Sequence, residues 1–276
     1  QQAARFWSNM DEFVVTGTAT VDKVLGTKHS DNEKNKILKL GVYSEYKDRY
    51  FKARWFGVVN PNRVDASITT QKPEDFFTNE NLRASRVFYS EGTNFDDKYT
   101  AQNLLNAGYV SFYMPLTSKL NATIGFRGEY NQQSLQSRER GGGQKVDVDN
   151  RIFSPMPSLN ANYKLNDKNM IRLGYGSTVN RPEFRELAPF TYYDFIFDVS
   201  RRGNKDIKVA NIHNFDLRYD FYPSPGELIT FGAFYKKFIN PIEAAIFYNG
   251  STVAFTVANS ESATSSGIEL EVRKNI

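Results

Sequence analysis

The sequence predicts an all-β fold, an antiparallel up-and-down transmembrane β-barrel to which this chain contributes about nine strands. Apolar and polar residues alternate with a period of two, short turns alternate with long polar connections, and the chain is rich in aromatic residues, with 16 Tyr and 22 Phe. The expected strands lie within residues 13–25, 37–58, 109–116, 120–130, 153–165, 171–176, 214–221, 229–236 and 268–273.

The clearest alternation runs from Leu120 to Tyr130, where apolar side chains occupy the even positions and Arg127 and Glu129 occupy odd ones. Successive side chains of a strand point to opposite faces, so one face of this strand is apolar and the other polar. The same reasoning applies to the later strands. We therefore expect six residues to face lipid: Ile124, Phe126, Leu217, Tyr219, Ile229 and Phe231.

The segment 37–58 is an exception, because its apolar residues change phase. They lie at even positions up to Val42 and at odd positions from Phe51 onward. A β-bulge or a turn near residues 47–49 would explain the change, since one extra residue moves every later side chain to the other face.

The connections are of two kinds, and they alternate. Short turns are expected at residues 117–119, 166–169 and 224–227, and a medium one at 26–35; long polar segments cover 60–98, 134–150, 180–210 and 240–266. A barrel with tight turns at one rim and long loops at the other gives this order, and the long loops are then extracellular. A soluble β-sandwich has less reason to keep that order, but it also shows alternating faces and stays open as an alternative.

Composition excludes several other classes of protein. There are 35 Lys and Arg against 31 Asp and Glu, and a net charge of +4 is too small to indicate nucleic-acid binding. No stretch approaches the roughly 20 apolar residues of a membrane-spanning helix. The mean hydropathy of −0.54 argues against a helical membrane protein but not against a barrel with a polar interior. Without cysteine, neither disulfides nor thiolate metal sites can form.

Motifs for catalysis or metal binding are weak. Residues 141–145 (GGGQK) lack the Gly-Lys-Ser/Thr ending of a phosphate loop. Asp147 and Asp149 lack the bidentate Glu of a calcium loop. His29 and His213 lie far apart in the sequence, which does not support zinc binding or a Ser-His-Asp set. We expect no metal site, no cofactor and no enzyme activity.

Several segments resemble the TonB-dependent receptors of Bacteroidetes-type outer membranes, from about Pro157 onward. They are LNANYKLND (159–167), IRLGYG (171–176), VNRPEFRELAPF (179–190), DLRY (216–219), YPSPGE (222–227), FYKKF (234–238), NPIE (240–243) and GIELEVRKN (267–275). The N-terminal half matches more loosely, through residues 46–49 and the strand pair at 109–130.

This resemblance implies the cell outer membrane of a Gram-negative bacterium and a barrel of about 22 strands around a plug domain. Residues 1–276 would be one partial barrel domain, and the plug and the coupling box would not be present in this sequence. The implied partners are outer-membrane lipid, TonB and the inner-membrane energising complex through the missing N-terminal part, and a surface lipoprotein as a further candidate. The chain opens at Gln1 without Met and closes within a strand-like segment, so we expect a fragment.

The resemblance also implies a function, the active uptake of a scarce nutrient ligand, which could be a metal chelate, a glycan, a peptide or a vitamin. Two alternatives remain: an outer-membrane barrel with a passive, anchoring or assembly role, and a soluble carbohydrate-binding β-sandwich.

A charge cluster lies where a strand enters a long connection, at Arg181, Glu183, Arg185 and Glu186. These side chains could contact substrate or the plug. The favoured interpretation is that they pair within the lumen and hold the root of the loop, because buried charges need partners. Pro182 suits the end of a strand.

An aromatic group follows at Tyr192, Tyr193, Phe195 and Phe197, close to Arg201 and Arg202. Aromatic faces can stack on sugars or apolar ligands, so we expect Tyr192 and Tyr193 to be candidates for substrate binding together with Arg181, Glu183 and Arg185. Packing of this loop on its neighbours is the favoured alternative.

Overall fold

The computed structural model describes residues 4–27, 34–59, 70–82, 87–194, 196, 199–249 and 252–275. The main sheet has ten strands, one of which, β3 (Phe88–Glu91), pairs only with the end of β2. The others follow one path: β1 (Ala4–Leu25), β2 (Lys36–Val59), β4 (Lys98–Pro115), β5 (Leu120–Arg138), β6 (Lys145–Asn166), β7 (Asn169–Asn180), β10 (Ala210–Phe221), β11 (Leu228–Ile239) and β14 (Ser262–Arg273). Each expected strand corresponds to one strand of this path, which confirms the predicted fold class.

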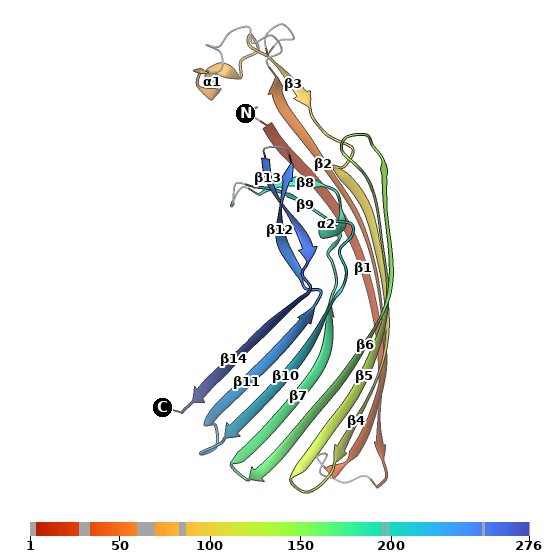
Figure 1. The fold of residues 1–276 in the computed structure, drawn as a ribbon, viewed down its shortest axis with the longest axis vertical. Helices are drawn as coiled ribbons and strands as arrows, with labels where there is room; N and C mark the ends of the chain where they lie inside the picture. Colours follow the sequence, from red (N-terminus) through yellow and green to blue (C-terminus); the bar gives the residue numbers. More distant parts are fainter. Residues whose placement is uncertain are drawn as a thin grey trace.

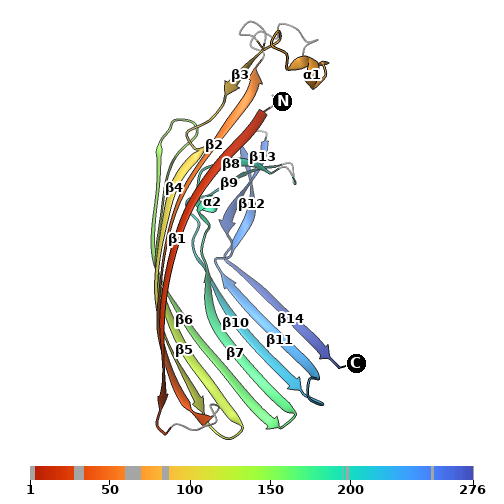
Figure 2. The same cartoon turned by 180° about the vertical axis from the view of Figure 1, so that it is seen from behind.

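A second sheet has four strands, in the order β12 (Ile242–Asn249), β13 (Thr252–Asn259), β9 (Val199–Arg202) and β8 (Thr191–Asp194). The described residues include two helices of one turn, α1 (Pro73–Phe76) and α2 (Phe184–Leu187). Figures 1 and 2 show that the main sheet is strongly curved, with α2 and the second sheet on its concave side. Among the described residues, no helix has the length and the apolar character needed to cross a membrane.

The convex face of the main sheet carries the predicted apolar band. Paired residues of neighbouring strands share a face, and Leu217 pairs with Leu173 on one side and Ala233 on the other. Leu217 is 53% exposed, and the other five residues expected to face lipid are also large, exposed apolar side chains. Their neighbours Arg127 and Arg218 lie on the opposite face. One curved sheet with an exposed apolar band is a barrel wall, so the β-sandwich alternative is wrong.

The expected bulge in β2 does not exist. Pairing runs without a register shift from Leu25↔Lys36 to Ala4↔Gly57 with β1, and from Ile37↔Tyr113 to Lys52↔Lys98 with β4. The apolar residues change face because the surroundings change. Near Leu40 the convex side is apolar, whereas near Phe51 the concave side packs against a folded loop.

Residues 134–150 are also mostly strand and not a long loop. β5 extends to Arg138 and β6 begins at Lys145, so the connection spans only residues 139–144. Leu135 and Val148 point to the concave side and are buried there. Polar side chains made this pair of strands look like a loop, but within the strands most of them, at residues 136, 138, 145 and 147, lie on the convex face.

The remaining long connections carry structure of their own. Residues 60–98 contain α1 and β3, residues 180–210 contain α2, β8 and β9, and residues 240–266 contain the hairpin of β12 and β13. His29, Phe195 and Phe197 lie outside the described residues. In the part of the chain that the structure describes, β1 pairs with β2 alone and β14 with β11 alone.

Candidate functional site

The segment after β7 folds onto the concave wall, close to the long-loop rim. Phe184, Leu187, Ala188 and Phe190 are each at most 3% exposed. They share one apolar core with residues of the wall: Ala53, Tyr99, Ala101, Leu135 and Val148. This core fixes residues 184–190 inside the curve of the sheet, so they line the mouth of the barrel.

The root of this segment is held by a buried carboxylate. Glu129 is 7% exposed and lies on the concave face of β5. Its two oxygens accept hydrogen bonds from Arg127 Nε at 2.7 Å and from Arg181 Nη2 at 2.6 Å. Gln133 Nε2 donates to the carbonyl oxygen of Pro182 at 2.9 Å. Arg181 and Pro182 are thus tied to β5 where the loop leaves β7.

Glu183 caps α2. Its side chain accepts from the backbone N–H of Glu186, and its own backbone N–H donates to Glu186 Oε2 at 2.8 Å. This reciprocal pair satisfies donors that the start of a helix leaves free. Both carboxylates are thus engaged within the first turn of α2.

The structure brings two of the predicted site residues together. Arg185 Cζ lies 5.0 Å from the centre of the Tyr192 ring, within the range of a cation–π interaction. Both side chains border a cavity of about 110 Å³, which we call the arginine cavity. Its lining consists of Arg185, Glu186, Tyr192, Arg201, Arg202, Gly203, Phe255, Thr256 and Val257.

The three arginines of this cavity differ in their partners. Arg201 Nε contacts Asp194 at 2.9 Å, and Arg202 Nη2 contacts Glu139 at 2.5 Å. Among the described residues, no carboxylate lies within ion-pair distance of Arg185. The arginine cavity therefore carries one cation without an ion-pair partner among the described residues, beside an aromatic ring.

Tyr193 lies elsewhere. It pairs with Ser200 in the second sheet, is 37% exposed and does not line the arginine cavity. Of the five predicted site residues, the structure thus joins Arg185 and Tyr192, and it places Arg181 and Glu183 in the support of the loop.

The sequence did not indicate that Gly203, Asn204 and Phe255 help to build the arginine cavity. A Cβ built on Gly203 would lie 2.7 Å from the carbonyl oxygens of Arg185 and Glu186, so only glycine fits there. The next residue, Asn204, donates its backbone N–H to the Glu186 oxygen at 2.6 Å and its side-chain amide to the Val257 oxygen at 3.0 Å. The Gly-Asn pair was a readable turn signal. Phe255, in a segment expected to be a loop, gave no signal.

Among the described residues, no group of three or more His, Asp or Glu side chains is arranged to hold a metal ion. The two aspartates weighed for calcium lie in ion pairs, Asp147 with Lys145 and Asp149 with Arg151, each at 2.9 Å. His213 Nδ1 lies 3.1 Å from the hydroxyl of Tyr175.

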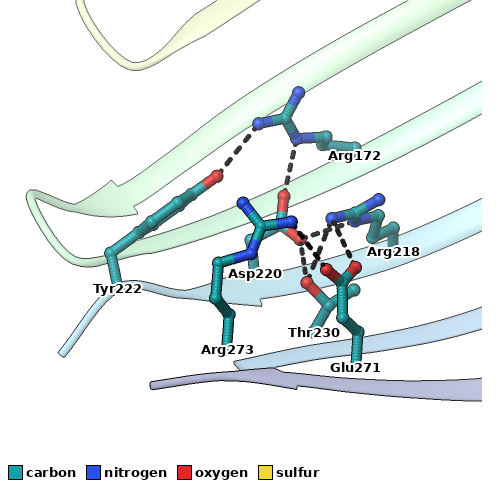
Figure 3. A network of polar contacts seen from close by, with 7 residues as sticks. All are labelled: Arg172, Arg218, Asp220, Tyr222, Thr230, Glu271 and Arg273. Carbon is teal, nitrogen blue, oxygen red and sulfur yellow. Dashed lines mark hydrogen bonds and ion pairs between the residues drawn. The ribbon is translucent and has the colours of Figure 1, made fainter. Parts of the chain in front are cut away.

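A second polar group lies on the concave face near the short turns (Figure 3). Asp220 is fully buried and accepts from Arg172 Nε at 2.7 Å, Arg218 Nε at 2.6 Å and Thr230 Oγ1 at 2.9 Å. Glu271 and Arg273 of β14 continue the group. Side-chain pairs thus join β7, β10, β11 and β14 on the side of the sheet that faces a polar lumen.

Comparisons with solved structures agree with this architecture. The chain is similar to the ferric yersiniabactin uptake receptor FyuA from Yersinia pestis, with 13% identity, a TM-score of 0.56, and coverage of 97% of this chain and 33% of FyuA. It is also similar to the hemophore receptor HasR of Serratia marcescens, solved with HasA and heme. The identity is 11%, the TM-score is 0.54, and the match covers 95% of this chain and 46% of HasR. For the alcaligin outer membrane receptor FauA from Bordetella pertussis, the identity is 13% and the TM-score is 0.51. This match covers 98% of the chain and 36% of FauA.

The chain spans between a third and about half of the length of these receptors. No curated protein matches it in sequence. The sequence model of the Outer membrane protein beta-barrel family matches residues 66–276, which is most of the chain. That family and the similar structures are outer-membrane proteins and receptors, not enzymes. The chain therefore belongs to the Outer membrane protein beta-barrel family and lies in the outer membrane of a Gram-negative bacterium.

Proposed function

We propose that the full protein is a TonB-dependent receptor of the Bacteroidetes type that takes up a scarce nutrient ligand actively. In this proposal residues 1–276 form part of the barrel wall, and a plug domain and a coupling box lie elsewhere in the protein. TonB and the inner-membrane energising complex supply the energy, and a surface lipoprotein is a further partner. Outer-membrane lipid surrounds the apolar band.

One observation carries the proposal: loop segments fold into the concave side and build a cationic and aromatic cavity at the mouth. A barrel that only anchors other proteins has no need of such a cavity. FyuA is a ferric yersiniabactin uptake receptor, HasR is a hemophore receptor solved with HasA and heme, FauA is an alcaligin receptor, and their barrels share this fold. This likeness supports uptake without naming the ligand of this chain.

The arginine cavity suggests the chemistry of that ligand. The unneutralised guanidinium of Arg185 favours an anionic group, and the rings of Tyr192 and Phe255 favour a flat or apolar part. A cavity of about 110 Å³ holds only a portion of a nutrient-sized molecule, so the cavity would take one end of the ligand.

The test is uptake in a strain that lacks the gene and carries either the full-length protein or a variant. A panel of ferric chelates, heme, vitamins, peptides and glycans would be offered as the limiting nutrient. We expect growth on one class to need both this protein and TonB.

Arg185→Gln should weaken uptake about tenfold or more, which is the scale of one lost charge-assisted hydrogen bond. Arg151→Gln, which removes an exposed arginine on the convex face, serves as the control. Growth that is independent of TonB would contradict active uptake and favour a passive barrel.

A further inference from the structure

A second cavity adjoins the arginine cavity. It lies among α2, β9 and the hairpin of β12 and β13, which gather on the concave side of the main sheet (Figures 1 and 2), and it also reaches the turn between β5 and β6. We call it the neighbouring cavity. Arg202, Gly203 and Thr256 border both cavities, so these three residues form a shared wall.

Two of the three shared residues are fixed through their backbone. Gly203 packs so closely on the preceding loop that a Cβ built there would lie 2.7 Å from the carbonyl oxygens of Arg185 and Glu186. Thr256 lies within β13, which pairs with β12 along its whole length. Arg202 differs, because it contributes a long side chain with many rotamers. The Arg202 side chain is therefore the movable part of the shared wall.

Two partners hold this side chain in place. Arg202 Nε donates to the carbonyl oxygen of Pro189 at 3.1 Å, which is a contact within the same loop. Arg202 Nη2 donates to the carboxylate of Glu139 at 2.5 Å, and Glu139 belongs to the turn between β5 and β6. A hydrogen bond between two charged groups is stronger than one to a neutral carbonyl. Glu139 is thus the main restraint on Arg202, and it comes from another part of the wall.

Glu139 is itself well positioned, although the ion pair is partly exposed. Its backbone N–H donates to the Gln144 oxygen at 2.8 Å, and its carbonyl oxygen accepts from the Gly143 N–H at 3.1 Å. Both side chains of the Glu139–Arg202 pair are 36% exposed. Ion pairs with such exposure contribute little to folding stability. Loss of the pair should therefore free the Arg202 side chain without unfolding the loop.

The neighbouring cavity is suited to the extension of a ligand. Its volume of about 270 Å³ exceeds that of the arginine cavity, which is about 110 Å³. Its polar wall includes Lys205 and Asp206, which pair with each other at 2.8 Å and together carry no net charge. Its apolar wall consists of Val146, Leu187, Pro189 and Phe247. A flat, uncharged ring would be buried there against apolar side chains.

We propose that Glu139 determines ligand length: it holds Arg202 in the shared wall and thereby confines the bound part of the ligand to the arginine cavity. Release of Arg202 joins the two cavities into one site for longer ligands with the same anionic end. Glu139 does not border the arginine cavity, so it is a positioning residue that acts through Arg202. The inference rests on the proposed function, in which the arginine cavity takes an anionic and partly flat group.

The test uses full-length receptor in lipid nanodiscs and two probes that share one carboxylate, benzoate and para-phenylbenzoate. The carboxylate is expected beside Arg185 and the first ring beside Tyr192, whereas the second ring of the longer probe is buried only when the neighbouring cavity is open. Isothermal titration calorimetry, with receptor-free nanodiscs as the blank, gives both affinities. The readout is the ratio of the long-probe affinity to the short-probe affinity, because a general loss of structure weakens both probes alike.

Glu139→Met keeps the length of the side chain but removes its charge. It should raise the ratio about tenfold or more, since burial of the second ring adds hydrophobic stabilisation. The control is Asp147→Asn, which removes a carboxylate from an exposed ion pair of the same hairpin and should leave the ratio at the wild-type value. Arg202→Ala should also raise the ratio. Adding Glu139→Met to Arg202→Ala should change it no further, because Glu139 acts only through Arg202.

The outcomes separate this inference from the proposed function. If benzoate binds but the ratio stays constant in Glu139→Met, or rises equally in Asp147→Asn, the role of Glu139 is overturned and the proposed function stands. A ratio that Glu139→Met still raises in the Arg202→Ala background also overturns it, because Glu139 would then act on the ligand directly. If benzoate binds neither the wild type nor any variant, the anionic ligand of the proposed function is contradicted, and the role of Glu139 falls with it.

Discussion

Leu217 illustrates how a single position is determined in this fold. It lies on the convex face between Leu173 and Ala233, whereas its neighbours Asp216 and Arg218 point to the concave side. Because side chains alternate along a strand, the sequence alone predicted this arrangement, and the register confirms it. The two faces differ in character: the convex face carries apolar side chains here, and the concave face carries charged ones.

Arg in place of Leu217 should therefore destabilise the full-length receptor in lipid vesicles by about 2–4 kcal/mol if this residue lies near the bilayer midplane. Asp216→Arg is the matched control, because it places the same side chain on the polar face and should cost much less. Urea unfolding in vesicles measures both values. Equal costs for the two variants would mean that both faces contact similar surroundings.

Gly41 is a second position where one atom matters. It lies on the concave face of β2, and a Cβ built on it would overlap the ring of Tyr109. That ring is held in place by a hydrogen bond of 2.7 Å between its hydroxyl and Thr20 Oγ1. Gly41→Ala should displace the ring and destabilise the receptor by about 1–3 kcal/mol.

The control is Gly17→Ala in β1, because no atom lies within 4 Å of the Cβ position at Gly17. Unfolding curves of the two variants, recorded side by side, should differ by more than the experimental error. If Gly41→Ala is as stable as Gly17→Ala, the ring of Tyr109 can move aside at no cost.

The elements at the mouth show where prediction from sequence reached its limit. The charge cluster at Arg181 was recognised, and its pairing was the favoured interpretation, but its partner Glu129 lies in another strand 52 residues away. Only tertiary structure reveals such a pair. The helix α2 has four residues and no apolar period of its own, so nothing local announced it.

Long strands beyond the membrane caused the other errors. In β2 the side chains alternate between the two faces without interruption, but the apolar ones lie on the convex face in its first part and on the concave face near Phe51. If all apolar residues are assumed to lie on one face, this change is interpreted as a bulge. Likewise Leu135 and Val148 are apolar because α2 covers them, which a search for lipid-facing residues cannot detect.

The docking of α2 on the wall should depend on Leu187, which is fully buried. Leu187→Ala should cost about 2–5 kcal/mol at this contact and release residues 184–190 without unfolding the barrel. Hydrogen exchange of the full-length receptor should show faster exchange in this segment and unchanged exchange in β10 and β11. Leu116→Ala, at a position 54% exposed beside a short turn, is the control. Uniformly faster exchange would mean that the loop and the barrel form one cooperative unit.

At the scale of the whole molecule, the two rims should be accessible from opposite sides of the membrane. We expect protease added to intact cells to cut within residues 60–98 and to spare the short turn at 224–227. The buried core at Phe184 and Leu187 should protect the start of the 180–210 connection, so cleavage there should fall after Phe190. Cleavage of the short turn in intact cells would reverse the assigned topology.

The main sheet has two edges, β1 and β14. In the described part of the chain, β1 pairs only with β2 and β14 only with β11, so each strand presents one row of unpaired backbone groups. In lipid, every unpaired group costs several kcal/mol, and only closure into a barrel removes such edges. The side chains near the β14 edge repeat the pattern of a wall, with Ile268, Leu270 and Val272 on the apolar face and 63–72% exposed.

We therefore expect both edges to pair with strands outside residues 1–276 when the full protein folds. Alternate N–H groups of β14 point to opposite neighbours, so hydrogen exchange of residues 268–272 separates the two sides. In the full-length receptor both sets should exchange slowly, whereas in isolated residues 1–276 one set should exchange fast. A single pair of introduced cysteines, Val15→Cys and Ile268→Cys, is free of native competitors because the chain has no cysteine. If that pair forms a disulfide in the membrane, β1 and β14 are neighbours, the barrel is small and complete, and a lumen wide enough for a plug is lost.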